Sequence, residues 1–231
     1  LQIVKESSFL LLDLINDILD LSKIEAGKIE LKPQPLNLPA LIQKTVNSLT
    51  VMAEKKGLKL YYLIDSNVPS EIIADKNRLR QIIINLLGNA IKFTLEGECS
   101  IKVSVKQEKE ETNDNKQKTL IFSIHDTGPG IPDKIQREIF NPFTQADNSY
   151  TRNNEGSGLG LAIVKQIIDL AGGSVWLESE LGKGSSFYFT LPVPIPKENN
   201  GKKVSDILAG KQSLNRGIKI LVVHDNPVNR N

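Results

Sequence analysis

Residues 76–93 constrain the fold more than any other stretch, because their apolar side chains recur at every third or fourth position. This spacing predicts an amphipathic helix, with one buried face and one polar face. The predicted buried face consists of Leu79, Ile82, Ile83, Leu86, Leu87, Ala90 and Ile91. A helix with so wide an apolar face is stable only when a sheet or other helices cover it. The chain must therefore supply such a partner.

Other stretches supply that partner. Two more helices are predicted, at 39–56 and at 159–171, each ended by glycine. Pro33, Pro35 and Pro39 predict a connector before the first of them. Strands are predicted near residues 58–64, 100–106, 119–125, 174–179 and 185–192. We therefore expect an α/β (α+β) two-layer sandwich, in which a mixed sheet carries helices on one face.

The two ends of the chain have the character of other domains. Residues 1–26 predict a helix with a wide apolar stripe, which Gly27 ends. This helix either packs on its own domain or forms one arm of a helical bundle or dimer. Residues 193–216 are rich in Pro, Asn, Gly and Lys and predict a linker. Residues 218–223 predict a short strand that is buried on both faces of a parallel sheet.

Composition excludes several classes of protein. The net charge of +2 over 231 residues gives no reason to expect nucleic acid or an anionic membrane as the main partner. A single cysteine, Cys99, excludes an internal disulfide framework and a cysteine-based zinc cluster. No apolar run approaches the roughly 20 residues that span a bilayer.

A carboxylate followed by glycines occurs at residues 126–131 (DTGPGI). Asp126 ends a predicted strand, and Gly128 and Gly130 allow the backbone to approach a ligand closely. A carboxylate at the floor of an apolar pocket can accept a hydrogen bond from an exocyclic amine such as that of adenine. An ordinary Asp-Gly turn would contain the same residues, so this motif alone leaves both interpretations open.

Residues 156–161 (GSGLGL) open the helix predicted at 159–171. Glycines before a helix expose backbone N–H groups at its positive end, where anions bind. No Gly-Lys-Ser/Thr follows, so the pattern is not a Walker phosphate loop.

Asn85 and Asn89 lie four residues apart and share one face of the helix at 76–93. Their amide oxygens can bind a hard cation such as Mg²⁺, and Lys92 can meet a phosphate. A helix with simply exposed polar positions is the alternative.

Residues 140–143 (FNPF) begin a stretch, 140–158, that is rich in turn formers. Phe140 and Phe143 can anchor a flap there, from which Arg152 can reach a terminal phosphate. Two phenylalanines packed in the core are the alternative.

In chain order, the asparagine helix, the Asp-Gly turn, the loop begun by Phe140, the glycine-rich helix start and a final Gly-Lys-Gly turn at 182–184 follow one another. This order resembles the ATP-binding domain of sensor histidine kinases, whose fold is shared with gyrase, Hsp90 and MutL. The resemblance covers about residues 36–192. Residues 8–32 are similar to the second helix of the dimerisation and phosphoacceptor domain of these kinases. Residues 217–231 are similar to the start of a receiver domain, which marks a hybrid kinase. The implied segments are part of the dimerisation domain at 1–32, the catalytic domain at 33–195, a linker at 196–216 and part of a receiver at 217–231.

The resemblance implies a role for each site residue. Asp126 would bind the adenine amine, Asn89 and Asn85 would hold Mg²⁺, and Phe140 and Phe143 would anchor the lid over ATP. The groups acting on the transferred phosphoryl group would be Asn85, Lys92 and Arg152. The ATP-binding set would comprise Asn85, Asn89, Lys92, Phe93, Asp126, Gly128, Gly130, Ile131, Phe143, Gly156, Ser157, Gly158, Leu159, Gly160 and Leu161.

The implied reaction is phosphoryl transfer from ATP to a histidine of the dimerisation domain, in the same protein or in a dimer partner. Onward transfer would reach an aspartate of a receiver domain or response regulator. A homodimer without nucleic acid is implied, with this portion in the cytoplasm; membrane anchoring of the full-length protein stays open.

Neither histidine of the chain matches the acceptor. His125 is expected to be a packed histidine, and His224 stands where receivers usually carry an acid, which weakens the expectation of an active receiver. The acceptor is expected upstream of Leu1, so the chain alone is expected to be inactive as a kinase.

Two other functions remain to be weighed. One is a regulatory pseudokinase that holds nucleotide without transferring it, against which the intact motifs argue. The other is a hydrolytic ATPase of the gyrase or MutL kind. In those relatives a glutamate four residues before the magnesium asparagine activates water, whereas Asn85 stands there in this chain and cannot act as a base. We therefore expect weak ATP hydrolysis.

Overall fold

The chain forms a layered domain with short flanking elements. The computed structural model describes residues 15, 18–20, 22–23, 26–28, 30–106, 117–144 and 157–196. Its elements in chain order are β1 (Gln34–Asn37), α2 (Leu38–Lys55), β2 (Lys59–Ile64), β3 (Glu71–Ala74), α3 (Lys76–Phe93), β4 (Glu98–Val105), β5 (Gln117–Asp126), α4 (Asp133–Gln136), α5 (Gly160–Leu170), β6 (Val175–Glu180) and β7 (Gly184–Pro194). Among the described residues, no helix is both long enough and apolar enough to cross a bilayer.

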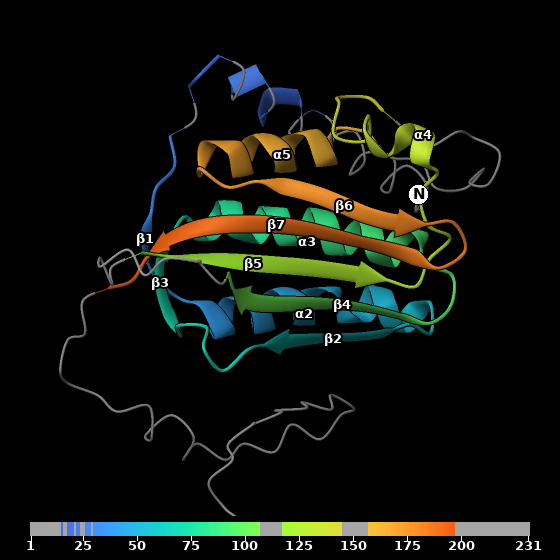
Figure 1. Ribbon diagram of the computed structural model, residues 1–231, viewed down its shortest axis with the longest axis horizontal. Helices are drawn as coiled ribbons and strands as arrows, with labels where there is room; N and C mark the ends of the chain where they lie inside the picture. The colour runs from blue at the N-terminus through green and yellow to red at the C-terminus, as the bar shows by residue number, and fades with distance from the viewer. Residues whose placement is uncertain are drawn as a thin grey trace, which may run out of the picture.

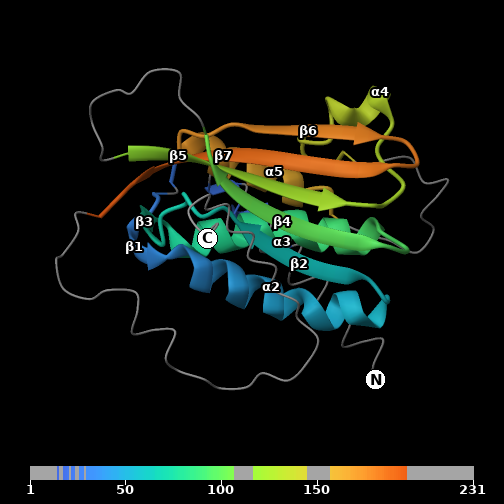
Figure 2. The ribbon, with the colours of Figure 1, turned by 60° about the horizontal axis from the view of Figure 1, so that its bottom comes forward.

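A five-stranded mixed sheet forms one layer, with the strand order β2-β4-β5-β7-β6. The β2–β4 pair is parallel, and the remaining neighbours are antiparallel. Helices α2, α3 and α5 cover one face of this sheet (Figures 1 and 2). A separate antiparallel pair, β1 and β3, lies at the edge of the domain. This arrangement confirms the predicted two-layer sandwich with helices on one face.

The hydrophobic core lies between the sheet and the helices. All seven residues predicted for the apolar face of α3 are buried. From the sheet, the rings of Phe122 and Phe189 stack on neighbouring strands with centroids 4.4 Å apart, and both side chains are fully buried. Each such ring contributes about 1.5–3 kcal/mol by leaving water. The polar face of α3 is thereby fixed in its orientation.

Local capping groups set the ends of the long helices. The Asp75 side chain accepts hydrogen bonds from the backbone N–H groups of Asn77 and Arg78, so α3 begins at Lys76. The Asn37 side chain accepts from the backbone N–H of Ala40 at the start of α2. Helices α2, α3 and α5 match the predicted ranges to within one residue at each end.

Four elements, β1, β3, α4 and β7, differ from the prediction. The stretch predicted as a proline-rich connector contains β1, in which Pro35 pairs with Ile73 of β3. Proline is tolerated there because both strands of a two-stranded sheet are edges. Neither strand β3 nor the single helical turn α4 was predicted. Strand β7 runs to Pro194, so the predicted linker begins later than residue 193.

The predicted terminal elements are only partly described. Of the helix predicted at 1–26, residues 15, 18–20 and 22–23 are helical, and Gly27 follows with a φ of 62°. The strand predicted at 218–223 lies outside the described residues.

Candidate active site

Those predicted site residues that the structure describes gather at one end of the domain. This is the end where β5 finishes, where α3 reaches its C-terminus and where α5 begins (Figure 1). Three stretches far apart in the sequence therefore meet at the same edge of the sheet.

Asp126 is the buried acid of this site, with 6% of its surface exposed. Its Oδ1 accepts a hydrogen bond of 2.8 Å from the backbone N–H of Gly128, which fixes the orientation of the carboxyl group. Burial raises the pKa of Asp126, although bonds from the backbone N–H groups of Gly128 and Ser185 and the charge of His125 act in the opposite direction. A fixed, desolvated carboxylate is a strong acceptor for an amine donor.

The turn after Asp126 is held against the β6–β7 hairpin. Gly130 has a φ of 74°, and a Cβ at this position would lie 2.2 Å from the carbonyl oxygen of Glu180, so no other residue fits without a backbone shift. The backbone N–H of Ile131 donates to the Ser179 hydroxyl at 2.8 Å. Gly130 and Ile131 thus fix the turn that carries the acid.

Asn85, Asn89 and Lys92 are half-buried on the polar face of α3. The amide nitrogen of Asn85 donates to the carbonyl oxygen of Gly160 at 3.3 Å, which connects α3 to the start of α5. Burial, and to a lesser extent the charge of Lys56, lowers the pKa of Lys92. The Lys92 ammonium lies 5.1 Å from the centroid of the Phe93 ring, which is 40% exposed.

The side-chain oxygens of this site suit a cation that is bound chiefly by phosphate oxygens and water, with few protein oxygens. Because the Asn85 amide nitrogen is bonded to Gly160, the amide oxygen is the group left to face a cation. Within the described ranges, no three His, Cys, Asp or Glu side chains cluster closely enough to hold a metal ion. Magnesium commonly keeps several waters and binds through few protein oxygens plus phosphates, so the two asparagines fit it.

The residues before α5 meet the start of the 140–158 stretch. The backbone N–H of Phe143 donates to the carbonyl oxygen of Gly158 at 3.0 Å. Gly158 has a φ of 69°, and a Cβ there would lie 3.0 Å from the Phe143 backbone, so glycine permits this close approach. The predicted contributors Arg152 and Gly156 lie outside the described residues.

The two phenylalanines differ in environment, although the sequence predicted an anchoring role for both. Phe140 packs edge-on against Phe187, with ring centroids 6.3 Å apart. Phe143 is 67% exposed and has a φ of 63°, a conformation that β-carbon-bearing residues seldom adopt. The ring of Phe140 therefore anchors this stretch to the core, whereas Phe143 contributes through its backbone.

The first turn of α5 presents backbone N–H groups toward the site end. Leu159 precedes the helix and makes no side-chain cap, while the Ser157 hydroxyl accepts from the Leu159 backbone N–H at 3.2 Å. Leu159 is fully buried and Leu161 packs against the core, so these two side chains support the helix rather than face a ligand.

Two residues of the site were not predicted. Thr94 is fully buried after α3, and its Oγ1 donates to the carbonyl oxygen of Ala90 at 2.7 Å. A Cβ on Gly128 would lie 3.2 Å from this Oγ1, so Thr94 borders the turn that carries Asp126. Lys56 reaches the end of α3 from the end of α2. A threonine after a helix and a lysine at a helix end are common, and neither gives a signal in the sequence.

His125 lies on the other face of the sheet from its neighbour Asp126, as successive strand residues do. Its Nδ1 is 3.0 Å from the Ser186 hydroxyl on the adjacent strand. This agrees with the expectation of a packed histidine and removes His125 from the site.

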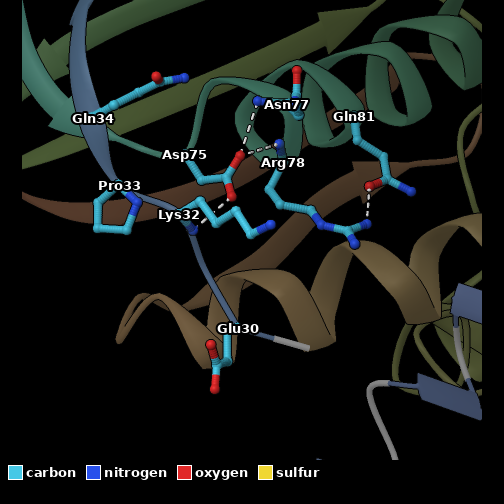
Figure 3. A pocket seen from close by; sticks show the side chains of 8 residues that line it. All are labelled: Glu30, Lys32, Pro33, Gln34, Asp75, Asn77, Arg78 and Gln81. Carbon is cyan, nitrogen blue, oxygen red and sulfur yellow. Dashed lines mark hydrogen bonds between the residues drawn. The ribbon is translucent and has the colours of Figure 1, made fainter. Parts of the chain in front are cut away.

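A second pocket, of about 510 Å³, lies at the opposite end of α3 (Figure 3). It is lined by Glu30, Lys32, Pro33, Gln34, Asp75, Asn77, Arg78 and Gln81. None of the predicted site residues that the structure describes borders it. The Arg78 guanidinium, which lines this pocket, donates hydrogen bonds to Asp20 and Gln81. The Arg78 side chain thereby connects the N-terminal helical residues to α3. The candidate site lies at the other end of α3.

Comparisons with known proteins identify similar sequences and folds. Residues 74–195 match the family model described as histidine kinase-, DNA gyrase B-, and HSP90-like ATPase. The sensor histidine kinase GacS of Pseudomonas protegens is 38% identical over 96% of this chain, which covers 23% of that protein. Hybrid signal transduction histidine kinase B of Dictyostelium discoideum is 40% identical over 85% of this chain and 10% of that protein.

Solved structures show the same fold. The crystal structure of full-length ShkA in complex with AMPPNP matches with a TM-score of 0.73 and 34% identity, covering 85% of this chain and 39% of that one. The nucleotide-free catalytic domain of histidine kinase ThkA matches with a TM-score of 0.52 and 27% identity, covering 70% of this chain and 95% of that domain. The chain thus spans about a quarter or less of the curated relatives named above.

Proposed function

Because the chain belongs to the family of histidine kinase-, DNA gyrase B- and HSP90-like ATPases, we propose that it is the ATP-binding core of a hybrid histidine protein kinase. In this proposal the core binds ATP with Mg²⁺ and transfers the γ-phosphoryl group to a histidine of the dimerisation domain. The phosphoryl group then passes to an aspartate of a receiver domain or response regulator. The relatives named as sensor or hybrid histidine kinases support this choice within the family.

Asp126 is the observation that carries the proposal. A buried carboxylate, oriented by Gly128 and placed at the same edge as the asparagine face of α3, is suited to an adenine amine. The amine would donate to the carboxylate, while the Gly128 bond prevents the acid from turning away. Thr94 would border the same part of the pocket.

The other residues would hold the triphosphate. Bound Mg²⁺ would neutralise phosphate charge, with the amide oxygens of Asn85 and Asn89 beside it. Lys92 and the N-terminal turn of α5 would contact phosphate oxygens. Phosphoryl transfer depends mainly on such positioning and charge neutralisation. Arg152 is proposed to act on the terminal phosphate.

Transfer to a histidine is favoured over hydrolysis because Asn85 stands where the hydrolytic relatives carry the glutamate that activates water. Asn85 is neutral, and its amide nitrogen is bonded to Gly160. His125 lies on the far face of the sheet, so the described residues place no histidine in the site. The acceptor is therefore proposed to come from the dimerisation domain, of which residues 1–32 would be a part, with a linker at 196–216 and receiver residues at 217–231.

A labelling experiment tests the proposal. The chain is incubated with γ-labelled ATP and Mg²⁺, alone and in a longer form that includes the dimerisation domain. Acid-labile, alkali-stable label on the longer form supports the kinase. Steady release of free phosphate would support a hydrolytic ATPase, and bound nucleotide without either product would support a regulatory module. The Asp126→Ala variant should lose the label, whereas Asp133→Ala, at an exposed acid of α4, should retain it.

A further inference from the structure

Lys56 connects the end of α2 to the end of α3. Its ammonium donates to the carbonyl oxygens of Ile91 at 2.9 Å, Lys92 at 2.5 Å and Thr94 at 3.3 Å. The three acceptors are contributed by the last turn of α3 and the residue that caps it. One side chain therefore organises the whole of this turn.

The physical reason lies in the end of the helix. The last four carbonyl groups of an α-helix have no partner within the helix, and their dipoles favour a cation. At the end of α3, the Ala90 carbonyl accepts from the backbone N–H and the hydroxyl of Thr94. Lys56 satisfies the carbonyls of Ile91 and Lys92 and supplies the cation.

The same turn carries both halves of the site. Lys92 lies on the polar face with the two asparagines, and Thr94 borders the Gly128 turn beside Asp126. The Thr94 hydroxyl also accepts a hydrogen bond from the buried Cys99 thiol at 3.6 Å. A shift of the backbone at Thr94 would therefore disturb this contact as well. A shift of this backbone would move the Lys92 side chain and the wall of the acid pocket together.

We propose that Lys56 is a positioning residue of the nucleotide site, which holds Lys92 and Thr94 in register with each other. This inference rests on the function proposed above. A role confined to joining two helices is less suited to Lys56, because the residue itself is exposed and contributes little to the core. Its bonds are all directed at the turn between the phosphate-binding and purine-binding residues.

The test compares three variants of the chain. Lys56→Met keeps the length of the side chain but removes its charge and its hydrogen-bond donors. Lys56→Arg keeps the charge and the donors. Lys55→Met is the matched control, because Lys55 is an exposed lysine in the last turn of the same helix. Affinity for ATP with Mg²⁺ is measured by calorimetry, and amide hydrogen exchange is measured without nucleotide.

We expect Lys56→Met to weaken ATP binding by about tenfold, as the loss of charge-assisted bonds predicts. Exchange of the Thr94 amide should accelerate, while exchange in β5 and β7 and the melting temperature stay near the wild-type values. Lys56→Arg should recover most of the affinity, and Lys55→Met should bind like wild type.

Other results would overturn the inference. Wild-type affinity in Lys56→Met would do so, as would equal losses in Lys56→Met and Lys55→Met. If the wild-type chain itself fails to bind ATP, the proposed function is wrong. Hydrogen exchange then still decides whether Lys56 orders the turn, because unchanged exchange at Thr94 would remove the positioning role.

Discussion

The amide nitrogen of Asn85 lies 3.3 Å from the carbonyl oxygen of Gly160, and this hydrogen bond connects the asparagine face of α3 to the first residue of α5. It leaves the amide oxygen as the Asn85 atom that could bind a cation, and it holds the first residue of α5 beside this side chain. The two halves of the proposed phosphate site are thus joined by one side chain.

Aspartate substitutions separate these two tasks of Asn85. Asn85→Asp keeps an oxygen for Mg²⁺ but replaces the donor with a second oxygen that faces the Gly160 carbonyl. Asn89→Asp is the matched control, because the described residues show no bond from Asn89 to α5. We expect Asn85→Asp to weaken binding of ATP with Mg²⁺ about tenfold more than Asn89→Asp, as an unpaired buried acceptor predicts. Equal losses in calorimetry would contradict this role.

The raised pKa of Asp126 predicts a pH dependence of stability. Burial raises the pKa above its value in the unfolded chain, so between these two values the folded state binds more protons. The contribution of Asp126 to the free energy of unfolding is therefore full at low pH and is lost as pH rises through the folded pKa.

Denaturant unfolding of wild type and Asp126→Asn, from about pH 3.5 to about pH 8, measures this effect. The difference in unfolding free energy, wild type minus variant, should decline with rising pH and then level off. ATP affinity should change in the opposite direction, because only the ionised carboxylate accepts from the amine without a competing proton. A difference that rises with pH would show that the pKa of Asp126 is lowered.

The contact between Asp20 and Arg78 should be measurable but modest. The two side chains are 2.9 Å apart and about a quarter exposed, and Gln81 also donates to Asp20. Burial alone would raise the pKa of Asp20, but bonds from Gln81 and Arg78 and the charges of Arg78 and Lys23 lower it overall. The stabilisation is therefore present at neutral pH and lost as pH falls through this lowered pKa.

A double-mutant cycle with Asp20→Asn and Arg78→Gln should give a coupling free energy on the order of 1 kcal/mol near neutral pH. The more exposed pair Lys102 and Asp65, 3.5 Å apart, should give a value near zero. Denaturant unfolding provides both measurements. Equal coupling free energies in the two pairs would contradict this prediction, because the less exposed pair, Asp20 and Arg78, should be the more strongly coupled one.

Phe140 and Phe143 should differ in their effect on stability. Phe140→Ala removes the edge-on contact with Phe187 and should lower the free energy of unfolding by about 2 kcal/mol. Phe143→Ala should change it by less than about 0.5 kcal/mol, because the ring is largely exposed. Similar losses in thermal or denaturant unfolding would show that both rings anchor the stretch.

The sequence predicted the long elements because each has a pattern that depends on near neighbours. The apolar spacing of residues 76–93 and the cap at Asp75 determine α3 without knowledge of the rest of the chain. Strands β1 and β3 have only four residues each and exist because they pair with each other across α2 and β2. The prolines of β1 indicate a connector, and only the pairing with β3 makes it a strand.

The site was predictable as a set of residues but not as an arrangement. The motifs identified Asp126, Asn85 and Gly160, whereas the bond between Asn85 and Gly160 depends on how α3 packs against α5. Lys56 and Thr94 were not predicted, because their roles arise from contacts between α2, α3 and the turn after β5. Such contacts leave no trace in local periodicity.

The single parallel pair in the sheet, β2 with β4, has a consequence for how the chain folds. Parallel strands require a crossover, and here the crossover contains β3 and all of α3. Strand β4 can pair with β2 only when α3, which lies between them in the chain, has packed against the sheet. Pairing of this kind is slow because the paired residues are distant in sequence. We therefore expect a substitution that unwinds α3 to delay folding as well as to impair the proposed site.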